Sequence, residues 1–298
     1  MNYIGEIAAL ATSLFWSITV FIFTFAGRMV GSQITNRVRL IFALTYLILL
    51  NAALYGEPIP VSVNPSRWWW LGISGLIGLS IGDAFLFQAF VSAGARLGSL
   101  LLSLAPIFGA FIAWVFFGET LTILQMIGIA FALAGVGWVI ASHEEEPNPI
   151  YGDLKRGISF GVLGALCQAV GLVLSKQGML DGFSPFKAGL MRMIVATFAM
   201  WIWTMLAGKT RVTFSALREK PRAIGLLALG ALMGPVLGVS MSLLAVQNTE
   251  VGVASTLMAL PPVIVLPISY FVFKEKVGWQ AVLGTILAIT GVAVLFLA

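Results

Sequence analysis

The sequence predicts an all-α polytopic membrane protein with ten transmembrane helices, built as two inverted five-helix repeats. The first observation behind this prediction is composition: 59% of the 298 residues are hydrophobic and only 10% are charged, against about 25% charged in soluble domains. The second is run length, because the apolar stretches reach the roughly 20 residues that a helix needs to cross a bilayer core. They lack the alternation of barrel strands. The third observation is an internal repeat.

One stretch of the chain occurs twice, since residues 94–140 align without a gap on residues 250–296, which lie 156 positions later. The equivalent pairs include Pro106 and Pro262, Glu119 and Glu275, Gly78 and Gly234, and Gly82 and Gly238. An ungapped match of this length indicates a duplicated chain. We interpret the prolines and glutamates of these pairs as a structural repeat motif.

The apolar runs predict ten spanning helices. In order, they cover residues 4–25, 37–55, 68–91, 97–117, 121–141, 157–177, 184–207, 222–245, 250–273 and 278–297. The longest hydrophilic stretch, 142–156, is the expected linker between a first repeat at 1–141 and a second at 157–298. Five helices per repeat is an odd number, so the second copy enters the membrane in the opposite sense. Inverted repeats of this kind are typical of secondary transporters.

Lysine and arginine gather in the loops after the first, third, fifth, seventh and ninth predicted helices. The clearest group is Lys209, Arg211, Arg218, Lys220 and Arg222. Because positive loops stay in the cytoplasm, we expect these five loops to be cytoplasmic and both termini to be extracytoplasmic. The net charge of +5 then reflects orientation, and no nucleic-acid partner is predicted.

Small residues and prolines indicate how the helices pack. Gly78-xxx-Gly82 and its repeat counterpart allow close helix approach, which is what drives association in lipid. Pro106 and Pro262 fall within predicted helices, where proline removes a backbone donor. They predict either fixed kinks that shape the bundle, or hinges or polar backbone that lines a cavity. Glu119 and Glu275 precede predicted helices and are expected to stabilise the positive helix N-termini.

Asp83 is the leading candidate for a functional residue. A charge within the bilayer is costly, so an ionisable group there is a functional candidate by default. Gln88 follows about 1.4 turns later, and the repeat equivalent of Asp83 is Val239. Asp83 could face a cavity, where it would exchange protons or bind a substrate amine. It could instead be a buried carboxylate that pairs with Arg39.

Four further polar residues are weaker candidates for substrate or coupling roles. Arg39 and Arg192 lie near the starts of the second and seventh helices, where they could also anchor neighbouring helices or snorkel. Lys176 ends the sixth helix and could attract an anionic substrate group or mark the membrane interface. Gln168 lies two turns before Lys176.

No enzyme, catalytic residue, cofactor or metal site is predicted. The GxSxG match at 157–161 lacks the strand–turn–helix context of a nucleophile elbow, and the lone histidine, His143, lies in the linker. Trp203 stands where a P-loop needs glycine, so ATP hydrolysis is unsupported. His143 and the glutamates beside it are best explained as a solvated linker rather than a metal site.

The spacing Pro-x(12)-Glu-x-Leu/Val-x(6)-Gly-x(6)-Gly, which starts at Pro106 and again at Pro262, resembles the EamA domain of the drug/metabolite transporter superfamily. The resemblance covers nearly the whole chain. It implies a ten-helix permease whose central cavity is lined by helices one to four and six to nine. Relatives of this kind export amino acids and other metabolites.

We therefore expect a secondary, non-ATP transporter of small organic metabolites such as amino acids or drugs, with export as the expected direction and alternating access as the mechanism. The expected partners are the substrate, the lipid bilayer of a prokaryotic cytoplasmic (inner) membrane, and protons as the coupling ion. The sequence leaves the oligomeric state open. The alternative is a membrane binding or scaffold protein without transport activity, whose interior would be packed shut.

Overall fold

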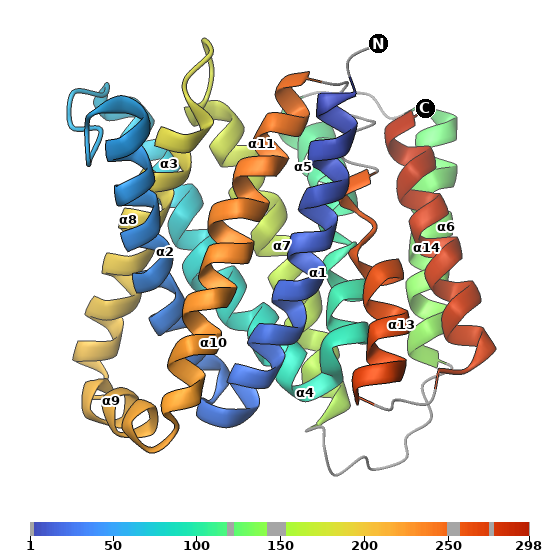
Figure 1. The fold of residues 1–298 in the computed structure, drawn as a ribbon. Helices are drawn as coiled ribbons and strands as arrows, with labels where there is room; N and C mark the ends of the chain where they lie inside the picture. Colours follow the sequence, from blue (N-terminus) through green and yellow to red (C-terminus); the bar gives the residue numbers. More distant parts are fainter. Residues whose placement is uncertain (1–2, 118–121, 142–152, 249–256, 274–276, 298) are drawn as a thin grey trace.

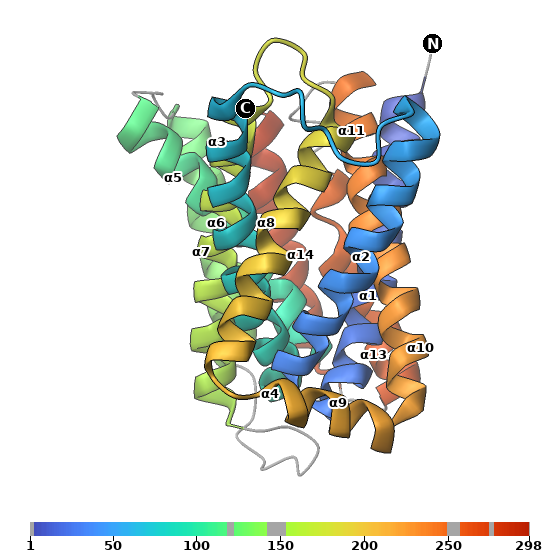
Figure 2. The same cartoon turned by 90° about the vertical axis from the view of Figure 1, so that its left-hand side faces the viewer.

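The computed structural model describes residues 3–117, 122–141, 153–248, 257–273 and 277–297, and over these ranges the chain is a bundle of helices without strands (Figures 1 and 2). The elements are α1 (Ile4–Val30), α2 (Ser32–Tyr55), α3 (Pro65–Gly75), η1 (Leu76–Gly82), α4 (Asp83–Leu102), α5 (Ala105–Phe117), α6 (Ile123–Ala141), α7 (Leu154–Gly178), α8 (Pro185–Leu206), α9 (Thr210–Glu219), α10 (Pro221–Ala231), η2 (Leu232–Gly238), α11 (Val239–Asn248), α13 (Pro261–Phe273) and α14 (Trp279–Leu297). Both η1 and η2 are π-helices.

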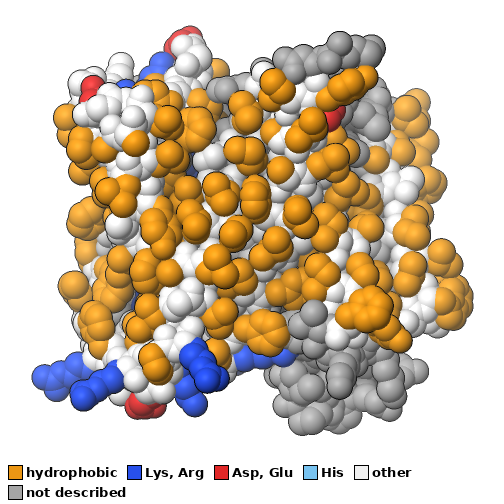
Figure 3. All heavy atoms as spheres, viewed as in Figure 1, with side chains coloured by type: hydrophobic (Ala, Val, Ile, Leu, Met, Phe, Trp, Pro, Cys, Tyr) orange, Lys and Arg blue, Asp and Glu red, His pale blue; other side chains and the backbone are white. Residues whose placement is uncertain are grey.

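The outside of the bundle is apolar, as a membrane protein requires. Hydrophobic side chains cover the middle of the face in Figure 3, and Lys and Arg gather at its lower edge. Seven of the described helical stretches are long and apolar enough to span a bilayer, and α13 and α14 add shorter apolar segments. The predicted all-helical membrane class is confirmed, while the predicted number of ten spans stays a prediction.

Local sequence signals account for several helix ends. The Asn64 side chain accepts a hydrogen bond from the Ser66 backbone N–H, and Pro65 takes the first position of α3. Asp153 accepts in the same way from Arg156 at the start of α7. Such caps satisfy backbone donors that have no partner within the helix. At its other end, α2 ends at Gly56, whose left-handed conformation suits a glycine.

Gly94 turns the chain back on itself inside α4. Its backbone angles are φ 85° and ψ 164°, a region that favours glycine. A Cβ atom on Gly98 would lie 3.5 Å from Cα of Phe90, although residues eight apart on a straight helix are separated by about 12 Å. The break thus falls between the predicted third and fourth helices.

The repeat is visible in the helix bounds themselves. Each element between Pro65 and Ala141 has a counterpart that begins 156 positions later in the chain. The pairs are α3 and α10, η1 and η2, α4 and α11, α5 and α13, and α6 and α14. Apart from the pair α4 and α11, the bounds agree residue for residue. The duplication therefore extends to backbone irregularities, because the π-helix recurs at the same place.

Three features differ from the sequence-based expectation. The stretch 210–219, read as a loop, forms α9, which lies across one end of the bundle (Figure 2). The α7 helix starts at Leu154, so the predicted linker at 142–156 ends early. The predicted helix 97–117 is interrupted at Ser103–Leu104, so that Pro106 begins a helix rather than kinking one. Glu119 and Glu275 lie outside the described residues.

Glycines bring backbones into contact where the helices cross. On α6 and α14, a Cβ on Gly135 would lie 2.5 Å from Gly284 O, and one on Gly291 would lie 2.5 Å from Gly128 O. The later residue on α6, Gly135, meets the earlier residue on α14, Gly284, whereas Gly128 meets Gly291. The two helices are therefore antiparallel. Small residues at such crossings allow the close packing on which association in lipid depends.

This packing predicts that Gly135→Ala destabilises the protein. Its Cβ would lie 2.8 Å from Ala288 Cα, a backbone atom that cannot rotate away, and overpacking costs about 1–3 kcal/mol. The matched control is Gly137→Ala on the same helix, where a Cβ meets nothing within 4 Å. We expect thermal unfolding in detergent to show a lowered midpoint for Gly135→Ala alone. Equal midpoints for both variants would contradict this account of the interface.

Candidate functional site

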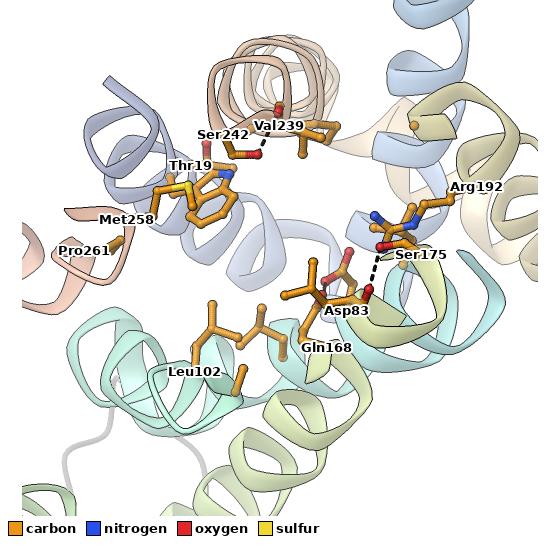
Figure 4. Close-up of a pocket in the computed structure, with 18 of the residues that line it drawn as sticks. Thr19, Asp83, Leu102, Gln168, Ser175, Arg192, Val239, Ser242, Met258 and Pro261 are labelled. Atoms are coloured by element: carbon orange, nitrogen blue, oxygen red, sulfur yellow. Dashed lines mark hydrogen bonds between the residues drawn. The ribbon is translucent and has the colours of Figure 1, made fainter. Parts of the chain in front are cut away.

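A cavity of about 410 Å³ lies at the centre of the bundle (Figure 4). Its lining residues come from α1, α2, η1, α4, α5, α7, α8, η2, α11 and α13, and within the described part of the chain α6 and α14 contribute none. Both copies of the repeat therefore line it. Most of the lining is apolar, and its aromatic members among the described residues are Trp16, Phe23, Phe87, Phe90 and Phe186.

The polar part of the site is built on the π-helix η1. Three successive carbonyls of this segment accept hydrogen bonds from side chains of other helices. Gly78 O accepts from Gln168 (3.2 Å), Leu79 O from Arg39 (3.1 Å) and Ser80 O from Asn36 (2.9 Å). A π-turn inserts extra residues into the α-helical pattern and is frequent at functional sites. Here Gly78 O and Ser80 O also accept from the Asp83 backbone N–H, so these carbonyls serve α2 and α7 as second acceptors.

Asp83 follows directly after η1 and is 6% exposed. Its Oδ2 is paired with Nη2 of Arg39, which is 3% exposed, and its Oδ1 accepts a 2.5 Å hydrogen bond from Gln168 Nε2. Both carboxylate oxygens are thus engaged. A buried ion pair is tolerated only when further hydrogen bonds satisfy its members, and Gln168 supplies one of these.

Arg39 is fixed from several sides. Its Nε and Nη2 donate to Asn36 Oδ1 at 3.2 and 3.1 Å, and its guanidinium lies 5.0 Å from the Phe87 ring centre and 5.9 Å from that of Phe23. Cation–π contacts of this kind gain strength when they are desolvated. Arg39 therefore does not snorkel to the membrane surface; it joins α2, η1 and α4 at the cavity wall.

Arg192 enters the cavity from α8 beside Ser175 (Figure 4). Glycines on the neighbouring α3–η1 segment make room for it. A Cβ on Gly75 would lie 2.8 Å from Arg192 Cα, and one on Gly78 would lie 3.5 Å from its Nη2. Unlike Arg39, Arg192 has a buried Nε without a hydrogen-bond partner among the described residues.

The structure thus brings together four of the six predicted candidates, namely Arg39, Asp83, Gln168 and Arg192. The other two lie elsewhere. Gln88 accepts from Ser32 (2.6 Å) and donates to Ser92 (2.8 Å), which links α4 to the start of α2. Lys176 is exposed on α7 and is absent from the cavity lining.

Asn36 is a part of the site that sequence reasoning missed. The predicted second helix began at 37, which left Asn36 in a loop, whereas α2 begins at Ser32 because Gly31 (φ 90°) ends the turn after α1 at once. Its spacing of three residues from Arg39, one helical turn, was the available signal.

The interrupted helices also reach the cavity. In the first repeat Ser103, Ala105 and Pro106 line it, and in the second repeat Ala259, Pro261 and Pro262 occupy the equivalent places. Pro106 and Pro262 thus both lie where a helix is interrupted beside the cavity. Such backbone is acceptable in a membrane protein only where protein or water, rather than lipid, surrounds it.

Comparisons with known proteins agree with this architecture. A curated relative, the uncharacterized transporter YyaM of Bacillus subtilis (strain 168), is 25% identical over 255 residues, which are 84% of this chain and 80% of the relative. An uncharacterized transporter of Clostridium kluyveri is 27% identical over 147 residues, which are 48% of this chain and 45% of that protein.

A solved protein structure covers 99% of this chain and 96% of its own at a TM-score of 0.57 and 15% identity, a likeness of fold alone. The model of the EamA-like transporter family matches residues 3–141 and, a second time, residues 155–297. The two matches together take in nearly the whole chain. The chain therefore belongs to the EamA-like transporter family.

Proposed function

We propose that the protein is a secondary transporter that moves small organic metabolites by alternating access, with export as its direction. The observation that carries the proposal is the cavity of about 410 Å³ lined by both repeats. Small-molecule sites are concave, mostly apolar and of about 300–1,000 Å³, with a few placed polar groups. The alternative, a scaffold without transport activity, gives no reason for such a cavity.

The mechanism rests on two halves, each with five spans, in opposite orientation. Equal element bounds in the two repeats support it, as does the antiparallel packing of α6 against α14. In Figure 1, α3 and the part of α4 before Gly94 descend from the end that carries both termini, whereas α10 and α11 rise toward it. In inverted-repeat transporters the substrate site lies near the midplane and discontinuous helices contribute to it. The interruptions at 103–104 and 259–260 fit this role.

We further propose that the Arg39–Asp83 pair couples transport to protons or contacts the substrate directly. The pair lines the cavity and lies at the junction of α2, η1 and α7. Protonation of Asp83 would remove the charge that holds Arg39, so it would loosen three helices together. Protons and substrate would then act on the same element.

Orientation follows from the basic helix α9. Lys209, Arg211, Arg218, Lys220 and Arg222 are exposed on or beside it, at the end of the bundle opposite both chain termini (Figure 1). By the positive-inside rule, that end faces the cytoplasm of a prokaryotic cell and the termini lie outside.

The coupling role predicts the behaviour of Asp83→Asn. We expect flux driven by an imposed pH gradient in proteoliposomes to fall at least about tenfold, since asparagine cannot carry the proton. The substrates to test are amino acids, nucleosides and common drugs. Loss of gradient stimulation with exchange intact assigns Asp83 to coupling, and loss of both assigns it to substrate binding.

Because Asp83→Asn leaves Arg39 buried without its partner, at a cost of about 3–5 kcal/mol, the decisive variant is Asp83→Asn combined with Arg39→Gln. The control is Glu57→Gln, which breaks the exposed 3.3 Å pair with Lys187 and should change little. Full gradient-driven flux in the folded double variant would make the buried pair purely structural.

The orientation predicts which residues an impermeant maleimide reaches in bacterial cells. Cys167 is the sole cysteine, so Cys167→Ser gives a clean background. Arg211→Cys on α9 should react only in inside-out vesicles, and Glu57→Cys, between α2 and α3 at the other end, should react in intact cells. The reverse pattern would invert the proposed topology.

A further inference from the structure

The charged groups of the cavity do not balance. Among the described lining residues, Arg39, Asp83 and Arg192 are the charged ones, which gives two guanidinium groups and one carboxylate. Val239 occupies the position of the second repeat that is equivalent to Asp83, so that copy supplies no acid. The cavity therefore carries an excess of one positive charge.

Asp83 forms an ion pair with Arg39 but not with Arg192. Its two oxygens are taken by Arg39 and Gln168. The described residues offer Arg192 no side-chain ion pair within 4.0 Å, and its buried Nε has no hydrogen-bond partner. The excess charge thus belongs to Arg192.

An unpaired guanidinium inside a membrane bundle is costly, because desolvation is not repaid by a partner. The fold nevertheless directs it inward. Gly75 lets α8 approach closely at Arg192, and Gly78 leaves the space over which the side chain passes. Figure 4 shows Arg192 pointing toward Ser175 and the cavity. The Nε atom is buried, so the donors that a ligand in the cavity can meet are those of the two terminal Nη groups.

We propose that Arg192 binds the acid group of the transported substrate, and that the substrate is a monoanionic organic acid with an apolar, preferably aromatic, body. The inference rests on the proposed transport function and names its substrate class. Arginine suits the role because its planar donors match a carboxylate in bidentate geometry. One negative charge neutralises the cavity, whereas a second would have no partner.

The rest of the cavity fits such a body. Trp16, Phe23, Phe87 and Phe90 line it together with leucine and methionine side chains. A substrate ammonium finds no unengaged carboxylate among the described lining residues, because both oxygens of Asp83 are occupied. The site therefore favours acids over amines, and acids over zwitterions.

Four compounds with one phenylpropyl skeleton test the inference. These are 3-phenylpropionate, its amide, 3-phenylpropylamine and phenylalanine, which adds an α-ammonium to the acid. Their affinities are measured by calorimetry on the full chain in lipid nanodiscs. We expect the acid to bind about ten- to a hundredfold more tightly than the amide, the range of charge-assisted hydrogen bonds, with the amine weakest and phenylalanine below the acid.

Variants assign the preference to one residue. Arg192→Gln should bring the acid down to the affinity of the amide, and Arg192→Lys should keep part of the preference because it keeps the charge. The control is Lys176→Gln, which removes an exposed positive charge of α7 outside the cavity lining and should leave the preference unchanged. Thermal unfolding verifies that each variant is folded.

Several results would overturn the inference: equal binding of acid and amide, tighter binding of the amine or phenylalanine, no binding of any of the four, or an acid preference that survives in Arg192→Gln. Because binding is measured without flux, each can occur while proteoliposomes still transport other compounds. In that case the transport proposal stands and only the anion site is lost. Acid preference without any transport would instead leave the site and remove the function.

Discussion

Apolar helices in a bilayer gain little by exchanging lipid for one another, so their association depends on how closely their backbones can approach. In this protein glycines provide that approach at matched places. Gly135 and Gly291 join α6 to α14, and Gly171 on α7 lies against Gly78 of η1. Because these contacts involve main-chain atoms, which cannot rotate away, they restrict how the helices can shift against each other. The polar groups of the cavity lie on these helices, so the same contacts set their positions.

The site shows how a charge is kept inside such a bundle. Arg39 and Asp83 pair with each other, and Asn36, Gln168 and backbone carbonyls of η1 satisfy their remaining groups. The π-turn is central, since Gly78 O and Ser80 O accept these side-chain hydrogen bonds in addition to the one from the Asp83 backbone N–H. Irregular backbone and buried charge therefore depend on each other at this point.

Much of the fold could be predicted from the sequence, and less of the site. Long apolar runs and an ungapped repeat are strong signals, and they identified the class, the family and most helices. Asp83, Arg39 and Gln168 could each be predicted as candidate residues. Their hydrogen-bonded network could not be predicted, because it depends on where α2 and α7 lie beside η1. The π-turns left no pattern in hydrophobicity, and α9 was hidden by its charges. Asn36 was missed because Gly31 makes the α1–α2 connection shorter than expected.

The two π-turns have a consequence for the energetics of the halves. Both repeats keep this turn, but only the first follows it with a carboxylate, whereas the second has Val239. The halves are thus alike in backbone and unlike in chemistry. If the two halves exchange conformations, the first repeat with Asp83 and the second repeat with Val239 exchange their surroundings between the two end states. Their free energies then differ even in the empty protein, so the two states are unequally populated at rest.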